Sequence, residues 1–335
     1  MVLTQNSPIR ERVRRSAMIT ENHGLTTLTF NAMGTVCRVC LVEPTRQAAN
    51  AYLNQSLNWV ADFESRYSRF LNDSLVSFIN TAAGKTWVEV DEETDRLFNL
   101  CNDLFFLTDG AFDPTALPLI RLWNWKANPP MVPDDDAIHA ARELTGWKKI
   151  QRRRGAIFLP QAGMCLDLGG IGKEYAVDMV MALAAEYGVE HVLVDFGQDI
   201  RARGHPPGRP AWHIGLENPQ NPGTCWSNVA VIDRAIASSG DYLRHFIHGG
   251  KRYGHILDPR TGYPVQNGCL AVNVVASTCT IAGILSTTAF ILGPQEGFHL
   301  INSYHGAAGA VLTNQGNFIT PRFYEHLVQQ KTQQH

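Results

Sequence analysis

The chain has 335 residues, of which 44% are hydrophobic and 18% are charged, and its formal net charge is −2 at pH 7. This length and balance are typical of a globular protein with a large core, in one unit or two domains, and exclude a disordered or fibrous chain. A net charge so close to zero gives no general attraction for nucleic acid or an anionic membrane, so any affinity for phosphate must come from a local site.

The first 23 residues are polar and basic and lack the apolar stretch of a signal peptide, so we expect a flexible arm. This favours a cytoplasmic location, unless a leader once preceded the chain. No apolar run reaches the roughly 18 residues that a membrane span requires. The seven cysteines are scattered, which argues against a disulfide framework. Cys37 and Cys40 form C-x-x-C in a strand-like run, where they would face opposite ways as core residues.

Hydrophobic periodicity predicts long helices separated by strand-like runs. In chain order the pattern predicts a strand over 25–42, helices over 45–67 and 92–107, a short helix from Asp134 to Leu144, a helix after Gly172, a strand over 191–196, strand-like runs to 275, a helix over 280–292 and a last strand over 308–313. We interpret the acidic run at 134–136 as a cap of the short helix rather than a metal site. Hairpin-like strands interrupted by long helices indicate an α+β fold rather than regular βαβ alternation. No repeat or low-complexity linker interrupts residues 24–330, which we expect to form one unit, followed by a tail over 331–335.

The segment from Asp167 to Lys173 reads Asp-Leu-Gly-Gly-Ile-Gly-Lys and directly precedes a predicted helix. Glycines let the backbone approach a ligand closely, free N–H groups at a helix start attract phosphate, and a lysine adds a positive charge. The segment therefore suggests a nucleotide-handling enzyme. It matches neither G-x-x-x-x-G-K-[ST] nor G-x-G-x-x-G, and a turn that only connects a strand to a helix would read similarly.

A second group of chemical residues lies between His255 and Gly262, which read His-Ile-Leu-Asp-Pro-Arg-Thr-Gly. Histidine is the usual general base near neutral pH, and Asp258 could orient it or bind a ligand. Equally, the aspartate and threonine could be turn residues and His255 a packed side chain. Ser239 and Gly240 could hold phosphate oxygens or form a polar turn, and Asp113 alone suggests an Asx turn.

Taken together and in this order, these segments resemble the ApbE family, the FAD:protein FMN transferases. The resemblance covers about residues 25–315. The matching segments are residues 32–35 (Ala-Met-Gly-Thr), 67–70 (Tyr-Ser-Arg-Phe), 110–115 (Gly-Ala-Phe-Asp-Pro-Thr), 167–178, 194–197 (Val-Asp-Phe-Gly), 239–242 (Ser-Gly-Asp-Tyr), 255–264 and 282–293.

The resemblance implies an α+β fold of paired T-fold-like halves, with antiparallel sheets, long helices and FAD in a cleft between the halves. It also implies a reaction in which a Ser or Thr hydroxyl of a partner flavoprotein attacks the FMN-side phosphorus of FAD. FMN becomes linked to the partner through a phosphoester and AMP leaves. Such a reaction requires a base for the hydroxyl and positive charge near the pyrophosphate, from a divalent cation and Lys173.

The family pattern also implies roles for individual residues. His255 is the candidate base, and Asp258 and Lys173 complete the catalytic set. Contacts with FAD are expected from eleven positions: Met33, Tyr67, Asp113, Asp167, Gly170, Lys173, Asp178, Ser239, Gly240, His255 and Thr261.

The magnesium site that the resemblance implies departs from the family pattern. The expected ligands are the carbonyl of Gly172 and side chains of an Ala-Asp-x-x-x-Thr pattern, of which Thr287 is present. The aspartate position is Gly283, and no Asp or Glu occurs between Gln266 and Gln295. Because a hard cation prefers anionic oxygen, Mg²⁺ binding should be weakened. Glu174, where the family has a small residue, could supply the charge or repel the pyrophosphate, but we expect it to point to solvent.

Two functions remain open from the sequence. The retained His255, Asp258 and Lys173 favour an active transferase with a rebuilt metal site. Gly283 favours a non-catalytic homologue that binds FAD as a carrier or accessory factor. A redox enzyme that holds FAD permanently is a weaker third hypothesis, because no segment of the sequence indicates a redox substrate site.

Overall fold

A computed structural model describes residues 8–43, 45–125, 127 and 129–328. The expected C-terminal tail and residues 1–7 of the expected arm lie outside this range. Contacts within the chain divide it into two compact units. Unit 1 comprises Met1–Asp62, Lys173–Gly240 and Gly268–His335, and unit 2 comprises Phe63–Gly172 and Asp241–Asn267.

Unit 1 is built on a nine-stranded sheet in which neighbouring strands are antiparallel. The strands follow the order β1 (Met18–Asn22), β2 (Leu25–Ala32), β3 (Thr35–Leu41), β7 (Val192–Phe196), β8 (Asp199–Arg203), β11 (Arg234–Gly240), β16 (Cys269–Ala276), β17 (Ala308–Thr313) and β18 (Gly316–Ile319). A separate hairpin joins β9 (Trp212–Glu217) to β10 (Cys225–Val231). The antiparallel pairing and long helices confirm the predicted α+β class.

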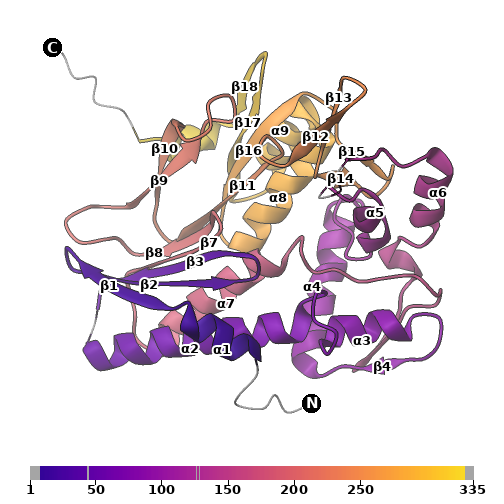
Figure 1. The fold of residues 1–335 in the computed structure, drawn as a ribbon. Coiled ribbons are helices and arrows are strands. Elements are labelled where there is room, and N and C mark those ends of the chain that lie inside the picture. Colours follow the sequence, from indigo (N-terminus) through magenta and orange to yellow (C-terminus); the bar gives the residue numbers. More distant parts are fainter. Residues whose placement is uncertain (1–7, 44, 126, 128, 329–335) are drawn as a thin grey trace. The chain divides into compact units, whose positions relative to one another are not determined.

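Helix α8 (Cys279–Leu292) packs on strands β11 and β16 (Figure 1). Gly283 on this helix is buried, and Thr287 is half-buried. It is apolar on nearly every side, as expected for a helix covered by a sheet and by its neighbour α9 (Pro294–Ser303). Helix α7 (Gly172–Glu186) is tied to α2 (Arg46–Tyr67) by a 3.2 Å hydrogen bond from the Tyr52 hydroxyl to the Val180 carbonyl. A short 3-10 helix, η2 (Pro321–Glu325), follows the last strand.

Two predictions near the N-terminus are wrong in part. Where the sequence suggested a flexible arm, the structure has helix α1 (Pro8–Arg15) and strand β1, which pairs with β2. The single predicted strand over 25–42 is a hairpin, because the chain turns at Met33 and Gly34 with φ of +51° and +71°. Methionine rarely adopts positive φ, so its presence at a turn gave no warning.

Unit 2 is a mixture of short helices and two- or three-stranded sheets. Its elements are α3 (Leu75–Ala82), β4 (Val88–Glu89), α4 (Glu92–Leu107), α5 (Leu117–Leu122), α6 (Asp135–Glu143), the 3-10 helix η1 (Trp147–Lys149), β5 (Gln151–Arg153), β6 (Ala156–Phe158), β12 (His245–His248), β13 (Lys251–Gly254), β14 (Leu257–Asp258) and β15 (Tyr263–Pro264). Its core includes Trp123, which packs with Leu119 and Leu257 and donates a 2.8 Å hydrogen bond to the Gly262 carbonyl.

The predicted helices of unit 2 begin where their capping residues indicate. Helix α4 has the predicted bounds, and the Asp91 side chain accepts a 3.0 Å hydrogen bond from the Thr94 N–H. Asp134 caps α6 in the same way, which confirms that the acidic run is a cap. Among the residues described, no helix is both long and apolar enough to cross a membrane.

Candidate active site

The glycine-rich segment forms a tight turn into helix α7. Leu168 and Ile171 are buried, whereas Gly169 and Gly170 between them are exposed. The Gly172 N–H donates a 2.7 Å hydrogen bond to the Leu168 carbonyl as the helix begins. The two apolar anchors therefore hold the turn while its glycine backbone stays open to a ligand.

Asp167 stabilises this turn through its carboxylate. One oxygen accepts a 3.0 Å hydrogen bond from the Gly169 N–H, and the other forms a 3.0 Å ion pair with Arg69. Arg69 belongs to the Tyr-Ser-Arg-Phe segment. From the sequence, Tyr67 in this segment was expected to contact FAD, but Arg69 was given no role. Asp167 was expected to contact FAD, and the structure gives its carboxylate two partners within unit 2.

Lys173 is paired with Asp199, a partner that the sequence did not identify. Its ammonium forms an ion pair with the Asp199 carboxylate, which lies on β8 and is 5% exposed. Burial alone would lower the pKa of Lys173, but the charges of Glu174 and Asp199 raise it. Lys173 therefore remains a cation at neutral pH, as a role near phosphate requires.

Glu174 does not point to solvent, so that prediction is wrong. The residue is 9% exposed and its side chain lies against Gly283 on α8. A Cβ atom added to Gly283 would lie 2.6 Å from Glu174 Cγ and 3.0 Å from Oε1. Burial and the nearby charge of Asp199 raise the pKa of Glu174 to about 8, although Lys173 opposes the shift. Glu174 can point toward α8 because Gly283, a residue distant in sequence, has no side chain to exclude it.

Three hydroxyl groups of unit 1 contact one another within one helical turn after Gly283. Ser239 on β11 forms hydrogen bonds of 2.8 Å with Ser286 and 2.9 Å with Thr287, both on α8. Ser286 in turn donates to the Gly283 carbonyl at 3.0 Å. The structure thus brings together Ser239 and Thr287, predicted separately as FAD and metal contacts, and Gly240 follows Ser239 on the strand. Ser286 was not identified from the sequence.

Asp178 anchors the start of α8. Its two carboxylate oxygens accept 2.9 Å hydrogen bonds from the N–H groups of Cys279 and Thr280, and Arg201 lies 2.8 Å away. A carboxylate at the positive end of a helix dipole is stabilising. The structure therefore gives this expected FAD residue a role in positioning the helix that carries Thr287.

His255 of unit 2 is half-buried and its Nδ1 atom is buried without a hydrogen-bond partner among the described residues. Burial and the charge of Arg244 lower its pKa. The backbone N–H of His255 donates a 3.0 Å hydrogen bond to the Arg244 carbonyl, which fixes the backbone. The imidazole is therefore neutral at pH 7, the state that a general base requires.

A clamp between Asp241 and Arg252 lies beside His255 in sequence and was missed. Asp241 is 2% exposed, and its two carboxylate oxygens lie 2.8 Å and 2.9 Å from Arg252 nitrogens. A Cβ at Gly254 would lie 1.9 Å from Asp241 Oδ2, so only glycine fits there. Asp241 was part of the matching Ser-Gly-Asp-Tyr segment, but nothing in the sequence indicated that Arg252 pairs with its carboxylate.

Asp258 and Thr261 form a turn with Arg260. The Asp258 carboxylate accepts three 2.9 Å hydrogen bonds, all from Arg260. Thr261 Oγ1 lies 3.3 Å from the Asp258 carbonyl and accepts a 3.2 Å hydrogen bond from the Tyr263 N–H. These contacts agree with the turn interpretation of the sequence, and they orient Arg260 rather than the histidine.

The remaining predicted FAD residues have structural partners in their own units. Asp113 accepts hydrogen bonds from the N–H groups of Thr115 at 2.8 Å and Trp147 at 3.1 Å, which includes the predicted Asx turn. Tyr67 is 5% exposed and its hydroxyl lies 2.9 Å from the Thr94 hydroxyl. Met33 lies at the β2–β3 turn and is half-buried.

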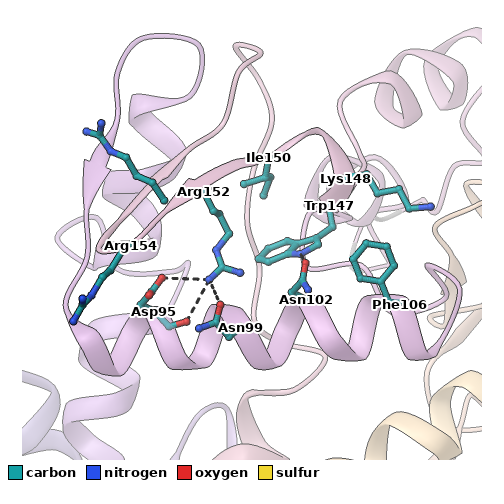
Figure 2. Close-up of a pocket in the computed structure, with 10 residues that line it drawn as sticks. Asp95, Asn99, Asn102, Phe106, Trp147, Lys148, Ile150, Arg152 and Arg154 are labelled. Carbon is teal, nitrogen blue, oxygen red and sulfur yellow. Dashed lines mark hydrogen bonds and ion pairs between the residues drawn. The ribbon is translucent and has the colours of Figure 1, made fainter.

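A pocket of about 550 Å³ lies in unit 2 between α4 and the segment 147–154, away from these residues in sequence (Figure 2). Its polar side chains are largely paired with one another. Arg152 donates to Asn99 at 2.6 Å and to Asp95 at 3.3 Å, and Trp147 donates to Asn102 at 3.3 Å. Figure 2 shows these contacts joining the helix to the segment above it. They hold α4 in place.

In the described part of the chain, no three or more His, Cys, Asp or Glu side chains gather as a metal site. Beside Gly283, where the family pattern has an aspartate, lies the Glu174 carboxylate, and the hydroxyls of Ser286 and Thr287 follow on the same helix.

Comparison with known proteins identifies one family throughout. The profile of the ApbE family matches residues 33–312. The chain is 32% identical over 294 residues to the FAD:protein FMN transferase of Treponema pallidum, covering 82% of this chain and 80% of that protein. It is 29% identical over 269 residues to the Vibrio cholerae enzyme of the same name, covering 79% and 80%.

Solved structures agree with this match. The ApbE protein from Thermotoga maritima superposes with a TM-score of 0.80 at 31% identity, covering 90% of this chain and 99% of that chain. The flavin transferase ApbE from Vibrio cholerae superposes with a TM-score of 0.81 at 25% identity, covering 93% and 100%.

Proposed function

Because the chain belongs to the ApbE family, we propose that it transfers FMN from FAD to a Ser or Thr hydroxyl of a partner flavoprotein and releases AMP. The observation that carries this proposal is the match, over about four-fifths of both chains, to relatives named FAD:protein FMN transferase. In the transfer, the hydroxyl oxygen forms a bond to the FMN-side phosphorus. The bond from that phosphorus to the bridging oxygen breaks, and AMP leaves with that oxygen.

His255 takes the hydroxyl proton in this proposal. Its pKa is lowered by burial and by Arg244, so the ring is neutral at pH 7 and has a basic nitrogen available. The hydrogen bond between its backbone N–H and the Arg244 carbonyl holds the residue in place. The adjacent Asp241–Arg252 clamp keeps the hairpin that precedes it rigid.

The pyrophosphate of FAD requires positive charge and close approach of backbone. Lys173 supplies a cation that stays protonated, and the exposed Gly169 and Gly170 leave room for phosphate oxygens. A divalent cation, held by the Gly172 carbonyl and the Thr287 hydroxyl, would neutralise the charge that develops on AMP as it leaves. Ser239, Gly240 and the remaining predicted FAD residues are proposed as binding contacts.

The test is incubation of the full chain with FAD, Mg²⁺ and a panel of flavoprotein domains with an accessible Ser or Thr. We expect covalent FMN on an acceptor by mass spectrometry and one equivalent of AMP for each FMN transferred. FAD that stays intact with every acceptor, while binding tightly at one equivalent, would contradict the proposal.

That contrary result would support the second candidate, a non-catalytic protein that binds FAD as a carrier or accessory factor. The observation in its favour is Gly283, where the family pattern has an aspartate. The buried Glu174 beside Gly283 weakens this argument, because a carboxylate is present after all.

A further inference from the structure

Glu174 is a buried carboxylate with an oxygen that lacks a partner. Within the described residues, its Oε2 atom is buried and accepts no hydrogen bond, and the residue as a whole is 9% exposed. Burying an ionisable oxygen without a partner is costly, so such groups persist chiefly where a ligand completes them. The nearest cation in sequence, Lys173, makes its ion pair with Asp199.

The Glu174 side chain occupies space that a side chain at position 283 would fill. A Cβ built on Gly283 would lie 2.6 Å from Glu174 Cγ, so the Glu174 side chain could not keep its present position beside a side chain at 283. The two residues are therefore alternatives: either position 283 carries a side chain or Glu174 reaches over it. Here a carboxylate from α7 lies over the helix face where α8 itself has none.

Further oxygen donors lie on the same face of α8. Ser286 and Thr287 follow Gly283 by three and four residues, the spacing that places helical side chains on one face. Ser239 joins both hydroxyls from β11 at 2.8 Å and 2.9 Å. A carboxylate together with neutral hydroxyl and carbonyl oxygens is the ligand set that Mg²⁺ and Mn²⁺ prefer.

From these contacts we infer that Glu174 is the anionic ligand of a divalent cation in unit 1, with Thr287 as its neighbour on α8. The inference rests on the proposed function for the cation's role, but not for its binding. The carboxylate that the family pattern places on the late helix has moved to the glycine-rich helix start, two residues after Gly172. Positions 174 and 283 are in contact, so the loss of a side chain at 283 and the gain of a glutamate at 174 are complementary changes.

The first test measures Mn²⁺ binding to the full chain, with and without FAD, by electron paramagnetic resonance and calorimetry. Glu174→Gln keeps the shape and removes the charge, so Mn²⁺ affinity should fall on the order of 10- to 100-fold. Glu186→Gln is the matched control, since Glu186 is an exposed glutamate on the same helix. The Mn²⁺ affinity of this control variant should stay within about twofold of that of the unsubstituted protein.

The second test reverses the exchange. Glu174→Ala frees the space over Gly283, and the double variant Glu174→Ala/Gly283→Asp places a carboxylate on α8. The double variant should bind Mn²⁺ more tightly than Glu174→Ala alone. Gly283→Asp without the first change is a poor probe, because its Cβ would meet Glu174.

Thermal unfolding separates a ligand from a structural residue. If Glu174 only balances the charge of Lys173, Glu174→Gln should lower the melting temperature and leave Mn²⁺ affinity unchanged, which would overturn the inference. Unsubstituted protein that binds no Mn²⁺ with or without FAD would overturn it as well. Loss of Mn²⁺ binding in Glu174→Gln supports it even if no acceptor is ever flavinylated, a result that would count against the proposed function alone.

Discussion

Glu174 in unit 1 and His255 in unit 2 each hold a buried polar atom without a hydrogen-bond partner in the described structure. Burial moves both toward the uncharged form, raising the pKa of Glu174 and lowering that of His255. After burial, the largest charge effect on each pKa differs in sign. The anion Asp199 raises the pKa of Glu174 against the opposing cation Lys173, and the cation Arg244 lowers the pKa of His255 against the opposing anion Asp241. The lowered pKa keeps the imidazole of His255 neutral and able to accept a proton.

The two regions also differ in how a glycine makes room. Gly283 leaves space for the flexible Glu174 side chain, which can move if the space is filled. Gly254 leaves space for Asp241, whose carboxylate is fixed by Arg252. The first region is therefore adaptable and the second is rigid, and the four predictions below test this contrast.

The largest effect is expected at the histidine. His255→Asn removes the proposed base, and flavin transfer from bound FAD should slow by about 10²- to 10⁴-fold, a larger change than any in FAD affinity. Single-turnover flavinylation measured alongside FAD titration would check this. His248→Asn, on an exposed position of β12, should react at the unsubstituted rate. Equal slowing in both variants would remove His255 from the mechanism.

Replacing Gly254 or Gly283 with alanine adds one methyl group beside Asp241 or Glu174, and the two costs should distinguish rigid from adaptable packing. Gly254→Ala drives a Cβ into the Asp241 carboxylate and should lower the free energy of unfolding by about 3 kcal/mol. Gly283→Ala meets only atoms of the Glu174 side chain, which can shift, and should cost about 1 kcal/mol. Urea unfolding of both variants gives the comparison. Equal costs would show that Glu174 is held as firmly as Asp241.

Removing the Lys173 ammonium, which pairs with Asp199, should destabilise unit 1. Lys173→Met leaves the buried Asp199 carboxylate without its partner and should cost roughly 2 kcal/mol, less than for a fully buried pair because the Lys173 side chain is 33% exposed. Lys173→Met/Asp199→Asn should recover most of this loss in urea unfolding. Lys85→Met, at an exposed position, is the control and should change little. A loss no greater than that of Lys85→Met would mean that the ion pair contributes nothing to stability.

The smallest effect is a pH dependence from His255. Because its folded pKa lies below the ordinary 6.5, the unfolded chain binds more protons just below that pH, and stability must fall as pH drops through this window. Above 6.5 this contribution to stability is fully present and no longer changes with pH. Unfolding measured across this range should show a shallower pH slope for His255→Asn than for the unsubstituted chain. Activity should likewise hold at pH 7 and decline only below the ordinary histidine pKa.

Local signals predicted several elements correctly. Helix α4 runs over the predicted residues because Asp91 caps it and its apolar residues repeat at helical spacing. The acidic cap of α6 was identified for the same reason. The hairpin of β2 and β3 was missed because its turn uses Met33, a residue that rarely signals positive φ. Strand β1 was missed because its exposed, polar residues lack an apolar alternation.

The sequence alone determined the family, the longest helices and the residue types available for chemistry, because these depend on local order along the chain. It also revealed that position 283 carries no carboxylate. Only the tertiary structure decided where Glu174 points and which partner Lys173 pairs with. Those outcomes depend on contacts between residues distant in sequence, where the absence of one side chain leaves room for another. The space beside Gly283 on α8 is thus occupied by the side chain of Glu174 from α7.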